Sequence, residues 1–129
     1  MVGKRKASIA RIWVWAISGD KKSVVSVNNR NCLSYFNNSP KALLDITRPF
    51  TVIDEDLSDY CVVCKVKGGG ISAQSEAVRL GISKCLLALL PHMRPALKKD
   101  KLLRRDSRIV EPKKTGLRGA RKREQFSKR

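Results

Sequence analysis

The feature that most restricts how this 129-residue chain can fold is the uneven distribution of its charge. Residues 98–129 carry fourteen Lys and Arg against four Asp and Glu, a net charge of +10 in 32 positions. The large apolar residues of this segment are few: Leu102, Leu103, Ile109, Val110, Leu117 and Phe126. So little apolar surface cannot offset the conformational entropy that folding removes. The sequence therefore predicts a globular body at 1–97 and an extended basic arm at 98–129.

The chain as a whole is strongly basic, with a formal net charge of +17. Such a charge implies a polyanionic partner, and nucleic acid is the most common one. A membrane helix is not expected, because no unbroken apolar run exceeds the six residues found at 85–90, against the roughly 20 that spanning requires. A secretory signal is not expected either, because the basic residues 4–6 lead into a strand-like segment and not into an apolar one.

Alternating apolar residues predict a first strand over residues 7–17. One face of this strand carries Ala10, Ile12, Val14 and Ala16, and the other carries Ile9, Arg11, Trp13, Trp15 and Ile17. Tryptophans on one strand face more often pack against a neighbouring element than stack on unpaired bases, so packing is favoured and stacking is the alternative. The other elements expected up to the glycine run are turns at 18–20 and 28–29, strands at 23–27, 49–53 and 58–67, a short helix at 32–36, and a helix from Pro40 to about Thr47.

The longest helix is expected from about Ser72 to Leu90, where Pro91 ends it. Its apolar stripe consists of Ala77, Val78, Gly81, Ile82, Cys85, Leu86 and Leu89, with Arg79 off the stripe. A shorter helix follows at about 94–101. Strands followed by helices predict an α+β fold, a small sheet with helices on one face.

No residue pattern indicates catalysis or a metal site. His92 is the only histidine and has no evident orienting partner, so we interpret it as a surface residue. Cys61 and Cys64 lie on a predicted strand, where residues three apart point to opposite faces, while Cys32 and Cys85 stand alone. We interpret the acidic residues 54–56 as a solvated loop. No catalytic residue, metal or cofactor is therefore predicted.

Three glycines, at 68–70, precede the long helix. They lack the spacing of a nucleotide-binding loop, so the favoured interpretation is a sharp turn that lets the helix pack closely on the sheet. The free N–H groups at the helix start leave a second interpretation open, in which this corner contacts a nucleic-acid backbone.

The basic side chains form the candidate nucleic-acid surface. Each Lys or Arg on a phosphate releases counterions, which makes binding tight and salt-sensitive but blind to sequence. The candidates are Lys4, Arg5, Lys6 and Arg11 near the first strand, Lys67, Gly69 and Arg79 around the glycine turn and its helix, and Arg104, Arg105, Arg108, Lys113, Lys114, Arg118, Arg121, Lys122 and Arg123 in the arm.

Four segments together resemble a known family. They are GKRKASIAR at 3–11, VKGGGIS at 66–72, AVRLGI at 77–82 and QFSKR at 125–129. In this order, and over nearly the whole chain, they are similar to protein nine of the small ribosomal subunit, the universal S-nine family, in its bacterial and organellar branch. The chain departs from the family's usual residues at Ala73, where glycine is common, and at Glu124, where a small residue or proline is common.

The resemblance implies a non-enzymatic structural role and the fold of the second domain of small-subunit protein five, with a left-handed βαβ crossover. It places the body in the head of the small subunit, on the 3′ major domain of the rRNA and beside other head proteins. The arm would pass through rRNA, and Ser127, Lys128 and Arg129 would contact the anticodon stem-loop of P-site tRNA. The compartment would be a bacterial cytoplasm or an organelle matrix, such as that of a mitochondrion, and the absence of a transit peptide favours a bacterial, organelle-encoded or trimmed chain.

Two alternatives remain at this point. An RNA-processing factor similar to the basic protein subunit of ribonuclease P would have a related fold, although acidic metal ligands are lacking near the basic residues. A general nucleic-acid chaperone would bind RNA or DNA without a fixed site.

Overall fold

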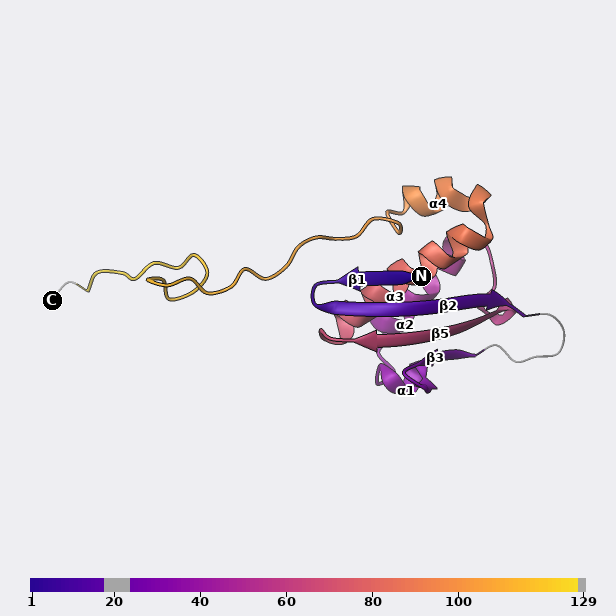
Figure 1. The fold of residues 1–129 in the computed structure, drawn as a ribbon, viewed down its shortest axis with the longest axis horizontal. Helices are drawn as coiled ribbons and strands as arrows, with labels where there is room; N and C mark the ends of the chain where they lie inside the picture. The colour runs from indigo at the N-terminus through magenta and orange to yellow at the C-terminus, as the bar shows by residue number, and fades with distance from the viewer. Residues whose placement is uncertain (18–23, 128–129) are drawn as a thin grey trace.

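The backbone of the body is organised around a mixed five-stranded sheet in the order β1-β2-β5-β3-β4. The computed structural model describes residues 1–17 and 24–127 of the chain. The strands are β1 (Val2–Arg5), β2 (Ser8–Ala16), β3 (Val25–Val27), β4 (Arg30–Asn31) and β5 (Tyr60–Lys67). β1, β2 and β5 form antiparallel pairs, whereas β3 runs parallel to β5 (Figure 1). A parallel pair needs a long connection, and here it runs through two helices.

The tight turns of the sheet explain where its strands begin and end. β3 and β4 are joined by Asn28 and Asn29, both with positive φ (50° and 63°), as a two-residue hairpin turn of type I′ requires. This confirms the turn expected at 28–29. The Asn28 side chain also pairs with the backbone of Val66, donating to its carbonyl at 2.9 Å and accepting from its N–H at 2.8 Å. Asn28 thereby joins the hairpin to the end of β5.

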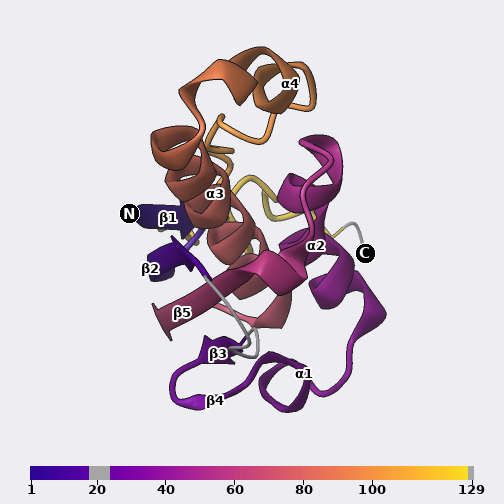
Figure 2. The ribbon, with the colours of Figure 1, turned by 90° about the vertical axis from the view of Figure 1, so that its right-hand side faces the viewer.

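The helices are α1 (Cys32–Tyr35), α2 (Pro40–Val52), α3 (Ile71–Leu89) and α4 (Arg94–Lys99). Single 3-10 turns, η1 (Leu57–Asp59) and η2 (Pro91–Met93), precede β5 and α4. α3 packs across β1 and β2, and α2 packs beside α3 on the same side of the sheet (Figure 2). The predicted fold class, an α+β body with a small sheet, is confirmed.

The core lies between the inner face of the sheet and these two helices. It includes Ile12, Val27, Phe36, Ile46, Phe50, Val62, Val78, Ile82 and Leu86. Leu97, the last residue of the predicted body, and Leu102, near the start of the predicted arm, are buried in the same cluster. Residues 105–127, by contrast, form neither helix nor strand and run away from the body (Figure 1). No helix among the described residues is long and apolar enough to cross a membrane.

Several sequence predictions agree with the structure within one to three residues. The strands expected at 7–17 and 58–67 are β2 and β5, and the long helix expected at 72–90 is α3. The helices at 32–36 and 94–101 and the strand at 23–27 also form, each somewhat shorter than expected. The turn expected at 18–20 lies outside the described residues.

The strand expected at 49–53 is wrong, because residues 49–52 complete helix α2 and Ile53 is its C-cap. The buried residues Ala42, Ile46, Pro49 and Phe50 continue one helical stripe, and its burial outweighs the β-branched and proline signals. β1 and β4 were not expected at all. Leu89, assigned to the buried stripe of the long helix, is 46% exposed at the end of α3.

The glycine turn between β5 and α3 yields a first prediction. Gly69 has φ +70°, and a Cβ there would lie 2.9 Å from the Cβ of Ser8. Gly69→Val should therefore destabilise the body by about 2 kcal/mol or more, through backbone strain and this contact. Gly70→Val is the matched control, because Gly70 has an extended φ of −101° and open space around it. Urea unfolding followed by circular dichroism should show a lower midpoint for Gly69→Val alone, and equal midpoints would contradict the strained turn.

Candidate nucleic-acid interface

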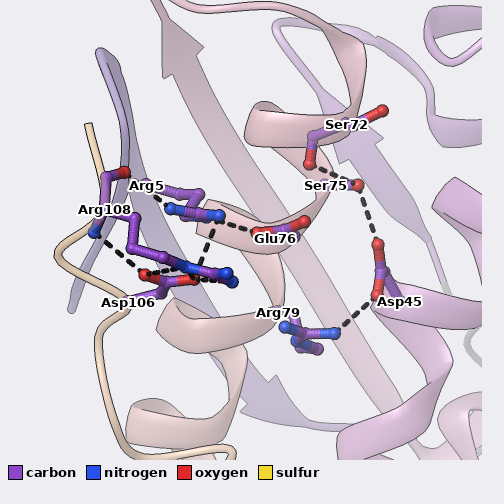
Figure 3. A network of polar contacts seen from close by, with 8 residues as sticks. All are labelled: Arg5, Asp45, Ser72, Ser75, Glu76, Arg79, Asp106 and Arg108. Atoms are coloured by element: carbon purple, nitrogen blue, oxygen red, sulfur yellow. Dashed lines mark hydrogen bonds and ion pairs between the residues drawn. The ribbon is translucent and has the colours of Figure 1, made fainter. Parts of the chain in front are cut away.

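Arg5, the second of the predicted nucleic-acid residues, lies inside the protein. It shares the buried face of β1 with Gly3 and is only 9% exposed. Its Nε donates to Glu76 of α3 at 2.5 Å, and its Nη2 lies 3.0 Å from the Asp106 carboxylate. Its Nη1 donates to the backbone carbonyl of Arg108 at 3.0 Å. Arg5 therefore ties β1, α3 and the start of the extended arm together (Figure 3).

Asp106 is the second centre of this network. It accepts a hydrogen bond from the backbone N–H of Arg108 at 2.9 Å and pairs with the Arg108 guanidinium at 2.7 Å. Arg108, with Arg5 adding its charge, holds the pKa of Asp106 well below its usual range. Because the lowered pKa keeps this carboxylate ionised, its ion pairs persist as the pH falls below the value at which an ordinary aspartate protonates.

Arg79 is also engaged within the protein. Its Nη1 lies 2.6 Å from Oδ1 of Asp45 on α2, and Oδ2 of the same carboxylate accepts from the hydroxyl of Ser75 at 3.0 Å (Figure 3). Ser75 donates to the backbone carbonyl of Ser72 as well, at 3.0 Å. The network joins α2 to α3. In the described chain, the guanidiniums of Arg5 and Arg79 are thus both paired with carboxylates.

A cationic hollow of about 430 Å³ opens beside the start of the arm. Arg104 and Arg105 are exposed at its rim, while Asp106 in its lining is already paired with Arg5 and Arg108. A phosphate entering this hollow would face more positive than negative charge. Its lining residues are Arg79, Lys101, Arg104, Arg105, Asp106, Ser107 and Arg108.

Apart from Arg5, the predicted basic residues near the sheet are exposed, and those on its strands lie on the outer face, away from the helices. Lys4 of β1 and Lys67 of β5 flank Ile9 of β2 in the strand register, and Arg11 lies opposite Lys65. Lys6 is exposed at the β1–β2 turn, and Gly69 is exposed immediately after β5. These residues lie near one another at one end of the sheet.

The basic residues of the distal arm are exposed, and a small loop brings some of them together. Glu111 pairs with Lys114 at 2.6 Å and with Arg121 at 2.7 Å, and these two cations, Lys114 first, lower its pKa. Arg118 donates its backbone N–H to the carbonyl of Lys122 at 2.8 Å, and its side chain lies 3.7 Å from Glu124. Lys113, Arg123 and Ser127 are exposed. Lys128 and Arg129 lie outside the described residues.

The cysteines have the geometry of ordinary core and sheet residues. Cys64 is buried on the inner face of β5, whereas Cys61 lies on the outer face, which confirms that the two side chains diverge. Burial raises the pKa of Cys64 to about 12 and that of Cys32 to about 11, so both thiols stay protonated. His92 is exposed. In the part of the chain that the structure describes, no three His, Cys, Asp or Glu side chains are grouped to hold a metal ion.

Comparisons with known proteins agree on one similarity. The family model described as Ribosomal protein S9/S16 matches residues 3–129. The small ribosomal subunit protein uS9 of Amoebophilus asiaticus is 45% identical over 128 residues, covering 99% of this chain and 95% of that protein. Those of Rickettsia conorii and Rickettsia prowazekii are 45% and 46% identical over 127 residues, covering 98% of this chain and 76% and 75% of those proteins.

Proposed function

Because the chain belongs to the ribosomal protein S9/S16 family, we propose that its body binds rRNA in the head of the small subunit and that its arm reaches P-site tRNA. Family membership itself makes the chain a structural, non-enzymatic constituent of the small subunit that binds rRNA and other ribosomal proteins. As a small-subunit protein, it belongs to a ribosome of the cytoplasm or of an organelle matrix. The accessory-enzyme alternative is thereby dismissed.

The observation that carries the proposal is the separation of the arm from the body. Beyond Arg108, whose carbonyl is held by Arg5, the described arm has no helix or strand, and its apolar residues are not buried in the core: Ile109 is 66% exposed and Phe126 is 90% exposed. Residues 109–129 can span up to ~70 Å when extended. A cationic segment of this length, anchored at one end, is suited to run between rRNA helices toward a distant phosphate.

For rRNA we propose two groups of contacts. The outer end of the sheet contributes Lys4, Lys6, Arg11, Lys67 and the backbone of Gly69. The arm contributes Arg104, Arg105, Arg108, Lys113, Lys114, Arg118, Arg121, Lys122 and Arg123. Arg5 and Arg79 act differently in this proposal, because they hold the arm and α2 in place through Asp106, Glu76 and Asp45.

The proposed contact with the anticodon stem-loop of P-site tRNA is made by Ser127, Lys128 and Arg129. Deleting these three residues should leave assembly intact and weaken P-site tRNA binding about tenfold, because charge-assisted hydrogen bonds to phosphate are lost. Filter binding of tRNA to purified small subunits measures the effect. Lys128→Arg with Arg129→Lys is the matched control, since it retains both charges and should retain affinity.

Unchanged tRNA affinity in the truncated subunits would refute the contact. The chaperone alternative is tested separately, by chemical footprinting of rRNA in assembled subunits. A chaperone without a fixed site leaves no defined footprint, whereas the proposed function requires one.

A further inference from the structure

The outer face of the sheet presents two half-exposed tryptophans that helices α2 and α3 do not cover. Trp13 is 46% exposed and Trp15 is 47% exposed, both on the face of β2 opposite the core. Their cross-strand neighbours on β5 are Val63 and Cys61. The favoured expectation of half-buried packing is met only in part, because about half of each residue is exposed and α2 and α3 lie on the other side of the sheet (Figure 2).

The same face carries four basic residues of the sheet, Lys4, Arg11, Lys65 and Lys67. Along β2 its outward residues run Ile9, Arg11, Trp13 and Trp15, about 7 Å apart at each step. Lys4, Lys65 and Lys67 extend the basic end onto β1 and β5. No Asp or Glu lies on any of the five strands, and the nearest acidic residue in the register, Asp59, follows beyond the Trp15 end.

A shallow hollow of about 210 Å³ lies at the basic end of this face, with an apolar floor and cationic walls. Ile9 supplies an apolar side chain, and Arg11, Lys65 and Lys67 supply the charges, whereas Val66 borders the hollow with its side chain buried in the core. A flat apolar group carrying a phosphate fits such a surface better than an uncharged peptide does. Nucleotides have both parts, and unpaired bases stack on aromatic side chains presented by open sheets.

We propose that this face binds single-stranded RNA, with unpaired bases stacked on Trp13 and Trp15 and the adjoining phosphates on Arg11 and Lys65. In the subunit, the ligand would be an unpaired rRNA segment. The strand would run from the Lys4–Lys67 end toward Trp15 and stop there, because Asp59 opposes phosphate beyond that point. The inference rests on the rRNA-binding role of the family and is independent of the tRNA contact proposed for the arm.

The chain itself contains the probe needed for a test, because Trp13 and Trp15 are its only tryptophans. The full-length protein is titrated with single-stranded oligoadenylate of about a dozen nucleotides, within the range of known single-strand sites, and with inorganic polyphosphate. Stacked bases should quench the tryptophan fluorescence, whereas polyphosphate occupies only the cations and should leave it nearly unchanged. Equal changes with both ligands would overturn the proposal.

Two sets of variants separate stacking from charge. Trp13→Leu and Trp15→Leu should each weaken oligoadenylate binding at least about fivefold while keeping the salt dependence, because stacking is lost and no phosphate contact changes. Trp13→Phe, which retains a stacking ring, should lose much less. Arg11→Gln should instead reduce the slope of log affinity against log salt by about one. Wild-type affinity in both Leu variants would overturn the proposal.

A third measurement decides between RNA and a protein partner. In assembled small subunits, a photo-crosslinker introduced at Val63, between the outer-face residues of β5, should capture rRNA. Capture of a ribosomal protein alone would overturn the proposal and identify the face as a protein interface. Either result leaves the tRNA test on residues 127–129 unaffected, so the two proposals fail independently.

Discussion

Replacing the eight Lys and Arg residues of segment 113–129 by Gln should weaken binding to small-subunit rRNA about a thousandfold or more near physiological salt. These side chains are Lys113, Lys114, Arg118, Arg121, Lys122, Arg123, Lys128 and Arg129. A protein that makes six to ten phosphate contacts loses about 10³- to 10⁵-fold in affinity when the salt concentration rises fourfold. The loss arises because each contact releases counterions. Glu111 and Glu124 offset part of this charge, so the lower end of that range is expected.

The measurement is rRNA affinity at several salt concentrations. The slope of log affinity against log salt should fall by several units in the Gln variant. The matched control exchanges each Lys for Arg and each Arg for Lys, which keeps the charge and should keep the slope. The urea midpoint should be the same in all three proteins, because the described part of this segment, residues 113–127, contributes nothing to the core cluster. An unchanged slope would show that the arm does not lie on phosphates.

A single methyl group at Gly3 should have the largest effect on stability. A Cβ at this position would lie 1.9 Å from the backbone carbonyl oxygen of Ala77 and 2.8 Å from the backbone nitrogen of Gly81. Both atoms belong to α3, so no side-chain rotation relieves the overlap. Gly3→Ala should therefore push β1 away from the helix and reduce the free energy of unfolding by about 3 kcal/mol or more.

Urea unfolding measures the change, and Lys4→Ala is the control because Lys4 is exposed on the same strand. Gly3→Ala should also speed proteolysis at residues 104–108, because displacing β1 moves Arg5 away from Asp106. If Gly3→Ala had the same urea midpoint as Lys4→Ala, the close approach of β1 to α3 would not be needed for stability.

The longest elements could be predicted from the sequence because their patterns are strong and local. The alternation in β2 and β5 and the apolar stripe of α3 each extend over eight or more residues. β1 and β4 have four and two residues and contain no such pattern. β1 forms because it packs on α3 through Gly3, and β4 forms because it continues the Asn28-Asn29 turn. Neither cause can be recognised from the residue pattern of the strand alone.

The partners of the basic residues could not be predicted for a different reason. Arg5 looks like Lys4 and Lys6 in the sequence, but the alternation of β1 turns Arg5 inward, toward Glu76, which is 71 residues away. Arg79 meets Asp45 only because α2 and α3 lie side by side. The ion pair of Asp106 with Arg5 is the hardest of these to predict. Asp106 lies among cations, in a segment whose net positive charge predicts only repulsion from the body. Placement of Trp13 and Trp15 on one face was predictable, but whether an element covers that face depends on the whole topology.

The Arg5–Asp106 network also sets the length of the free tether. Without it, helix α4 and the buried Leu102 would still hold the chain, and the free segment would comprise residues 103–129, or 27. With the Arg108 carbonyl held by Arg5, the tether comprises residues 109–129, or 21. Effective concentration at the tip falls roughly as the −3/2 power of tether length, so this shortening raises it about 1.5-fold for targets within reach. A buried arginine in the first strand thus increases the local concentration of the C-terminal end of the arm.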